Sequence, residues 1–190
     1  MVEKLDGNGK LKATMLKAHR AWAEEHTEDV LSRLGDLLGE TDRKHLDMAL
    51  LATEWIPFGA FVRIDRAIAE LVGGSVDANL RAMGHHSAIV NLGGIYKFFI
   101  KDEPHRFFTK MTVLHHRFQS FGEPAYEATG DRSGQMRIEG CEDFSKVYCW
   151  SALGYYEGAL EMMKVPGPVR AEEISCQCDG DPVCVYDLAW

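Results

Sequence analysis

The stretch 174-ISCQCDGDPVCVYDLAW-190 carries three of the five cysteines of the chain, Cys176, Cys178 and Cys184. Residues 179–182, Asp-Gly-Asp-Pro, are typical turn residues, and the residues on either side favour strands. Two strands joined by a tight turn face each other. The thiols of Cys176 and Cys184 are therefore expected to lie within metal-chelating distance.

All five cysteines lie after residue 140, and their number is odd. This pattern favours a local metal or redox site over a disulfide framework. Cys149 lies early in the helix that the pattern predicts before the hairpin. Thiolates favour Zn²⁺ in a tetrahedral site, and a carboxylate, Glu172 or Glu173, would complete it. Buried core cysteines remain the alternative, above all for Cys141 and Cys149.

The rest of the chain divides near residue 122. The first part, 1–121, has apolar residues at helical spacing, and the second, 122–190, mixes alternating patterns with one helix. Helices are expected over 11–38 (one long or two short), 46–71 with a pause at Pro57 and a stop at Gly73, 79–100, 103–121 and 143–164. Strands are expected at 126–139 as a hairpin with its turn at 130–134, and at 169–178 and 183–190. The fold class is α+β, with several N-terminal helices packed on a small antiparallel sheet.

Composition limits the function. With 190 residues, of which 46% are hydrophobic, the chain is expected to form a single domain, 1–190. A net charge of −8 offers no basic face to nucleic acid. The N-terminus lacks an apolar signal segment, and the apolar run 48–62, broken by Glu54 and Pro57, is too short to cross a bilayer. A cytoplasmic location without membrane contact is expected.

The motifs CWSALGYYEGALEMM (149–163), EEISC (172–176) and CDGDPVC (178–184) resemble the C-terminal half of the 4-vinyl reductase domain, over roughly residues 148–186. In the phenol-sensing regulators that carry this domain, three cysteines and one glutamate hold a zinc ion. The resemblance implies zinc as the cofactor, a turn at Gly180 and Asp181, and four ligands: Cys149, Glu173, Cys176 and Cys184.

The strand geometry raises a difficulty for this ligand set. Residues three apart in a regular strand point to opposite faces, so Glu173 and Cys176 can share an ion only at a bulge or a strand end. Glu172, Cys176 and Cys178 have the same parity and form a rival set. Three thiolates and a carboxylate also carry excess negative charge, which backbone N–H groups or a nearby cation must offset.

A second resemblance covers more of the chain. WIPFGAFVRIDRAIAELVGG (55–74), NLGGIYKFF (91–99) and GDPVCVYDLAW (180–190) resemble stand-alone proteins of myxobacteria and their relatives that share this fold. The 4-vinyl reductase fold is similar to haem-type nitric-oxide sensors and Golgi tethering subunits, which hold a small molecule, a haem or an acyl chain between helices and sheet. It implies a pocket, with candidate lining at Phe107, Phe108, Phe118, Phe121, Tyr126, Trp150 and Tyr155, although aromatic residues at helical spacing are more often core.

Known catalytic patterns are absent: GGIYK is not a P-loop, and neither GxSxG nor HExxH occurs. Haem ligation would fall to one member of the pairs His85-His86 or His115-His116, because adjacent helical residues diverge by about 100°. Four protein ligands would also close the metal site to water. The sequence favours a non-enzymatic ligand-binding or sensory domain with structural zinc, signalling through a partner or a homodimer formed by N-terminal helices. The alternative is a tetrapyrrole- or haem-handling protein or an accessory reductase component.

Overall fold

The computed structural model of the chain describes residues 2–46, 51–94, 96–101 and 103–190. Its helices are α1 (Ala13–His26), α2 (Val30–Leu37), α3 (Glu40–Arg43), α4 (Phe58–Val72), α5 (Val76–Gly93), α6 (Pro104–Leu114) and α7 (Lys146–Met162). Its strands are β1 (Lys10–Lys12), β2 (Trp55–Pro57), β3 (Glu123–Gly130), β4 (Ser133–Glu139), β5 (Arg170–Ser175) and β6 (Cys184–Ala189). Short 3₁₀ turns are η1 (Lys44–Leu46), η2 (Phe99–Lys101), η3 (His115–Arg117) and η4 (Gln177–Asp179).

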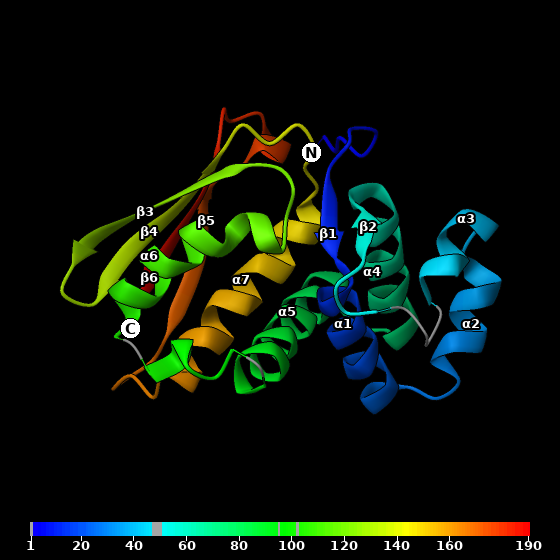
Figure 1. Cartoon of the computed structure of the whole chain (residues 1–190). Coiled ribbons are helices and arrows are strands. Elements are labelled where there is room, and N and C mark those ends of the chain that lie inside the picture. Colours follow the sequence, from blue (N-terminus) through cyan, green and yellow to red (C-terminus); the bar gives the residue numbers. More distant parts are fainter. Residues whose placement is uncertain (1, 47–50, 95, 102) are drawn as a thin grey trace.

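The predicted α+β architecture is confirmed (Figure 1). An antiparallel sheet in the order β3-β4-β6-β5 forms one side of the molecule. Helices α5 and α7 pack against each other, α7 also contacts β5, and α1 and α4 pack on the other side of α5. The α5–α7 pair therefore separates the sheet from the N-terminal helices.

The N-terminal part contains more and shorter helices and strands than the hydrophobic periodicity predicts. The stretch 11–38 contains two short helices, α1 and α2, and Leu11 itself lies in β1, paired with Ile56 of β2. The expected helix before Pro57 is wrong where the chain is described: Trp55–Pro57 is a strand, because its backbone completes the ladder with β1. Residues 47–50 lie outside the described part.

The later helices are shorter than predicted. Helix α5 ends at Gly93, and α6 begins at Pro104, where the side chain of Glu103 accepts hydrogen bonds from the first free backbone N–H groups. The predicted stop at Gly73 is correct, with φ at +85°. The helix expected over 79–100 is interrupted at Gly93 and Gly94, and the short turn η2 lies at the end of that range.

The C-terminal part follows the prediction closely. The hairpin β3–β4, the helix α7 and the strands β5 and β6 all form. Strand β5 ends at Ser175, three residues early, because η4 follows and Gly180 turns the chain at a φ of +100°. The carboxylate of Asp181 accepts a hydrogen bond from the backbone N–H of Cys176 at 2.9 Å, which fixes this turn.

Two helices approach each other closely at glycines. A Cβ built on Gly154 of α7 would lie 1.8 Å from the carbonyl oxygen of Arg81, and one on Gly84 of α5 would lie 1.9 Å from that of Ser151. Backbone atoms therefore occupy the space that any side chain would need. Arg81 also forms a bidentate ion pair with Glu157 of α7, at 2.7 and 2.5 Å, across the same contact.

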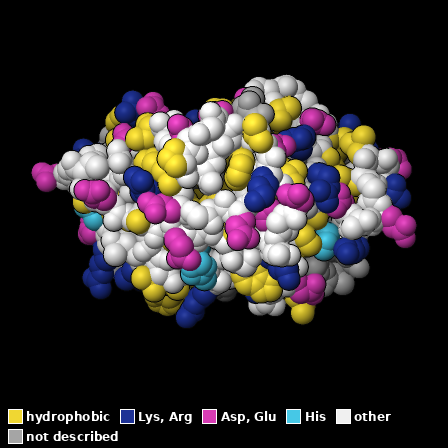
Figure 2. Space-filling view, turned by 90° about the horizontal axis from the view of Figure 1, so that it is seen from above, with side chains coloured by type: hydrophobic (Ala, Val, Ile, Leu, Met, Phe, Trp, Pro, Cys, Tyr) yellow, Lys and Arg dark blue, Asp and Glu magenta, His cyan; other side chains and the backbone are white. Residues whose placement is uncertain are grey.

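Figure 2 shows acidic and basic side chains interspersed over one face, without a region of a single sign. This agrees with the lack of a basic nucleic-acid footprint in the composition. No helix in the described part of the chain is long and apolar enough to cross a membrane.

Candidate functional site: a thiol cluster and an aromatic cavity

Three elements, α7, β5 and β6, bring sulfur and carboxylate atoms together. Cys149 lies in the first turn of α7, Cys176 directly follows β5, and Cys184 begins β6. One ligand atom from each of Cys149, Glu173, Cys176 and Cys184 lies within 4.8 Å of the other three. The structure thus brings together the four residues that the resemblance implies.

A bulge in β5 explains how Glu173 and Cys176 can face the same side of the strand. The β5–β6 register shifts between Glu173 and Ser175, which pair with Tyr186 and Val185 respectively. An extra residue in one strand reverses the alternation, so a position three residues from Glu173 can turn to the same side. The rival Glu172 is half exposed and lies 3.2 Å from Arg170 in an ion pair, outside the cluster.

The carboxylate of Glu173 has one oxygen committed and one free. Its Oε2 accepts a hydrogen bond from Lys146 Nζ at 2.5 Å, and Lys146 also reaches Asp179 at 2.6 Å. Its Oε1 is buried and finds no hydrogen-bond partner among the described residues. A buried polar atom without a hydrogen-bond partner costs free energy. A metal ion bound to this oxygen would remove that cost. Lys146 is the cation that the excess negative charge of the cluster requires.

The sulfur atoms have the spacing of a four-coordinate site. Cys149 Sγ and Cys176 Sγ are 3.8 Å apart. Metal–sulfur bonds of about 2.3 Å in tetrahedral geometry place two sulfurs roughly 3.8 Å apart. Hydrogen bonds from the thiols of Cys149, Cys178 and Cys184 lower the pKa of Cys176, which favours the thiolate, the form of cysteine that binds metal.

Cys178 and Cys141 lie outside this ligand set. Cys178 is buried beside the cluster, in η4. Cys141 lies apart, near Gly122, and burial raises its pKa to about 11.

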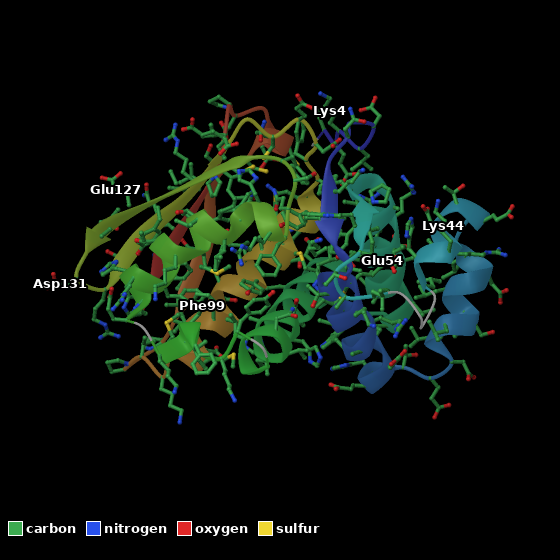
Figure 3. The ribbon with its side chains drawn as sticks, in the orientation of Figure 1. Lys4, Lys44, Glu54, Phe99, Glu127 and Asp131 are labelled. Carbon is green, nitrogen blue, oxygen red and sulfur yellow. The ribbon has the colours of Figure 1, made fainter. Side chains whose placement is uncertain are left out.

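A cavity of about 120 Å³ lies between the helices and the sheet. Its wall is mainly apolar, and the side chains that line it come from α1, α5, α7, β4 and β6 as well as the segment around α6. Figure 3 labels Phe99, one of the lining residues, on the lower side of the molecule near the helices. An engineered apolar cavity of about 150 Å³ stays dry and binds benzene, so this space suits one small ring. The aromatic lining consists of Tyr96, Phe99, Phe118, Tyr148, Tyr155, Tyr156 and Tyr186.

Two of the seven predicted lining residues, Phe118 and Tyr155, line this cavity. Phe108 instead stacks on Tyr126, with ring centroids 5.4 Å apart and planes at 27°. Phe108 has no exposed surface because α6 packs on β3 there. Phe108 therefore belongs to the core, and Tyr126, which is half-buried, lies beside it outside the cavity lining.

The remaining predicted aromatics also lie elsewhere. Phe121 packs edge-on against Phe58, with centroids 5.0 Å apart, in the N-terminal core, and Phe107 is fully buried. Trp150 lies on the opposite side of α7, in a surface groove beside Lys146 and Glu173. Neighbouring helix positions face different directions, so Trp150 and Tyr155 cannot be assigned to one wall from spacing alone.

The sequence reasoning missed a buried pair at the cavity, His19 of α1 and Asp65 of α4. Both have no exposed surface, and His19 Nδ1 lies 3.0 and 2.9 Å from the two carboxylate oxygens. Burial raises the pKa of Asp65, and the contact with His19 opposes that rise. A signal was present: Asp65 falls four residues after Phe61 and three before Ile68, on the apolar face of α4.

The histidine pairs behave as helical geometry requires. His115 lines the cavity and its Nε2–H donates to the carbonyl oxygen of Phe121 at 2.8 Å, while His116 is exposed. Burial lowers the pKa of His115, and the hydrogen bond to the Phe121 backbone opposes that shift. His85 lies 2.8 Å from Glu161 at the surface, away from the cavity lining.

Comparison with known proteins places the fold in one class, that of the H-NOX domains. An oxygen-binding H-NOX domain related to soluble guanylate cyclases is 17% identical, with a TM-score of 0.66 over 93% of this chain and 90% of that one. A Cs H-NOX mutant is 16% identical, with a TM-score of 0.70 over 94% and 96%. An Fe(II) unliganded H-NOX mutant from K. algicida is 12% identical, with a TM-score of 0.65 over 94% and 96%.

At such identities the likeness establishes an H-NOX-like fold. No family model matches this chain. No curated protein matches it either.

The prediction of zinc as the cofactor is corrected by these structures. Two further matches are described as studies of haem distortion, so the fold comparison points to haem and away from zinc. The cavity of this chain does not fit that group. Its volume of about 120 Å³ is well below the roughly 300 Å³ of pockets for drug-sized ligands, which are smaller than haem. Among the described lining residues none is Lys or Arg, so propionate groups would meet no cation there.

Proposed function

We propose that this chain is a non-enzymatic sensory domain that binds a small, compact, apolar or aromatic molecule in the cavity between α1, α5, α7 and the sheet. The observation that carries the proposal is this mainly apolar cavity, lined by seven aromatic rings, in a fold like that of an oxygen-binding H-NOX domain. A bound molecule would contact both the N-terminal helices and the sheet. Binding in the cavity would thus change the contact between α5 and α7, and a partner would respond to that change.

Haem handling is the second candidate. The likeness to haem domains favours it over a zinc-stabilised sensor, whereas the volume and charge of the cavity favour a smaller ligand. The two candidates differ in a simple observable, because bound haem colours the protein and a single-ring ligand does not.

We also propose that Cys149, Glu173, Cys176 and Cys184 hold a metal ion that fastens the β5–β6 hairpin to α7. The sulfur spacing, the free oxygen of Glu173 and the adjacent Lys146 support this assignment. The same ligand set supports kinship with the 4-vinyl reductase domain. Reduced thiols at all five cysteines suit a reducing compartment such as the cytoplasm.

Thermal-shift screening tests the binding proposal with three classes of compound: phenolics, fatty acids and tetrapyrroles including hemin. A ligand that binds only the native state raises stability by about 2.7 kcal/mol at a hundred times its Kd. We expect stabilisation by single-ring compounds at millimolar concentration and none by long acyl chains. A Soret band and a shift with hemin alone would favour the haem candidate, and no response to any class would refute ligand binding.

The chain is further proposed to form a homodimer through its N-terminal helices. Leu37, at the end of α2, is 61% exposed and would lie in such a contact. Light scattering at micromolar concentration should give twice the chain mass of 21.3 kDa. A mass equal to that of one chain would contradict the dimer.

A further inference from the structure

The His19–Asp65 pair is the least expected feature of the cavity, because it places two ionisable groups where neither has exposed surface. The pair joins α1 to α4, and the imidazole forms part of the cavity wall. Two such groups are expensive to bury unless each satisfies the other. Their contact explains why the burial of both groups is tolerated. It uses Nδ1 of His19 and leaves the second ring nitrogen, Nε2, available for another hydrogen bond.

The geometry of the pair defines the tautomer. Nδ1 lies almost equally far from both oxygens of Asp65, at 3.0 and 2.9 Å. One N–H can be shared between two carboxylate oxygens, whereas a protonated carboxyl would direct its O–H from a single oxygen. The shared contact therefore places an N–H at Nδ1, and in the neutral imidazole with that tautomer Nε2 carries a lone pair. A carboxylate behind a histidine has the same orienting effect in metal and catalytic sites.

The other polar groups at this end of the cavity satisfy one another. The hydroxyl of Thr14 donates to Asn91 Oδ1 at 2.8 Å. The Asn91 amide donates to the carbonyl and hydroxyl oxygens of Ser87, at 2.9 and 3.1 Å. These contacts form a closed chain between α1 and α5.

Among the described residues, Nε2 of His19 has a single contact, and it is a long one. The hydroxyl oxygen of Ser151, on α7, lies 3.4 Å away, beyond the usual range of a good hydrogen bond. A buried acceptor with so weak a partner gains most from a ligand that donates to it. The cavity thus has an apolar body with an acceptor at one end.

We propose that His19 Nε2 is the hydrogen-bond acceptor of the cavity, held in that tautomer by Asp65 as a positioning residue. The ligand is then a neutral, compact, apolar molecule that carries one hydroxyl or N–H donor. This inference rests on the proposed ligand-binding function and specifies its selectivity. Neutrality follows because an anion would meet no cation among the described lining residues. His19 and Asp65 both lie outside residues 148–186, the stretch that resembles the 4-vinyl reductase domain.

Cyclohexanol and cyclohexanone test the donor requirement, because they match in size and solubility and only the alcohol donates. Their dissociation constants are measured by NMR titration of the full chain. A hydrogen bond to a buried group contributes about 0.5–1.5 kcal/mol, so the alcohol should bind up to roughly tenfold more tightly. The ¹⁵N shifts of His19 should report a protonated Nδ1 in the free protein and an Nε2 that changes when the alcohol binds.

Two variants separate the roles of the neighbours. In Asp65→Asn the amide can donate to Nδ1 and move the proton to Nε2, so the preference for the alcohol should vanish or reverse. In Ser151→Ala the weak competitor for Nε2 is gone, so alcohol binding should strengthen a few fold while ketone binding stays unchanged. Ser151→Ala removes one oxygen atom and serves if Asp65→Asn does not fold.

The outcomes distinguish this inference from the function on which it rests. If both compounds bind equally well to the natural chain, or if the free protein carries its proton on Nε2, the assignment of His19 is wrong while the cavity remains a binding site. If neither these compounds nor benzene binds at millimolar concentration, ligand binding itself is refuted.

Discussion

Gly154→Ala is expected to destabilise the protein by about 3 kcal/mol or more, a large part of the 5–15 kcal/mol typical of whole domains. The added methyl group would lie 1.8 Å from the carbonyl oxygen of Arg81, a backbone atom of α5. Neither helix can give way locally, so α5 and α7 must separate. Urea unfolding measures the change, and a lower midpoint with an unchanged slope is the expected result.

Gly93→Ala, at the end of α5, is the matched control. A Cβ at Gly93 would meet only the terminal methyl group of Met162, at an ordinary 3.6 Å. Alanine is the better helix former, so this variant should be neutral or more stable by up to about 1 kcal/mol. If both variants lost the same unfolding free energy, the close approach of α5 and α7 would not be the reason that position 154 requires glycine.

The C-terminal half could be predicted because its signals are local. Turn residues, alternation and helical spacing placed β3 through β6 and α7 within a few residues. The grouping of Glu173 with Cys176 needed the resemblance as well, since alternation alone favoured Glu172. The deciding feature, a bulge between Glu173 and Ser175, has no sequence signal as clear as a turn.

The N-terminal half and the cavity depended on contacts distant in sequence. Lys10–Lys12 becomes a strand only because Trp55–Pro57 is beside it, and neither segment is long enough to be recognised alone. Aromatic residues were plentiful, but which ones face the cavity depends on how α6 packs on β3. Asp65 on the apolar face of a helix was the one local signal of the polar end of the cavity.

Cys176→Ser is expected to remove the bound metal ion and to destabilise the C-terminal part severely. Structural metal ions contribute folding free energy on the order of 10 kcal/mol in small metal-dependent domains. The sulfur of Cys176 lies 3.8 Å from that of Cys149, and hydrogen bonds from the neighbouring thiols lower its pKa. Elemental analysis of the purified chain across the transition metals should give about one ion in the natural protein and none in this variant.

Cys141→Ser is the control for this experiment, because Cys141 lies outside the cluster and should leave the metal content unchanged. Cys178→Ser is the stricter comparison, since Cys178 is buried beside the ligands without belonging to the set. A chelator should lower the melting temperature of the natural protein and of both controls, and have no effect on Cys176→Ser. A natural protein without metal would refute the site. Loss of metal in Cys178→Ser with retention in Cys176→Ser would contradict this ligand set, because Cys176 belongs to it and Cys178 does not.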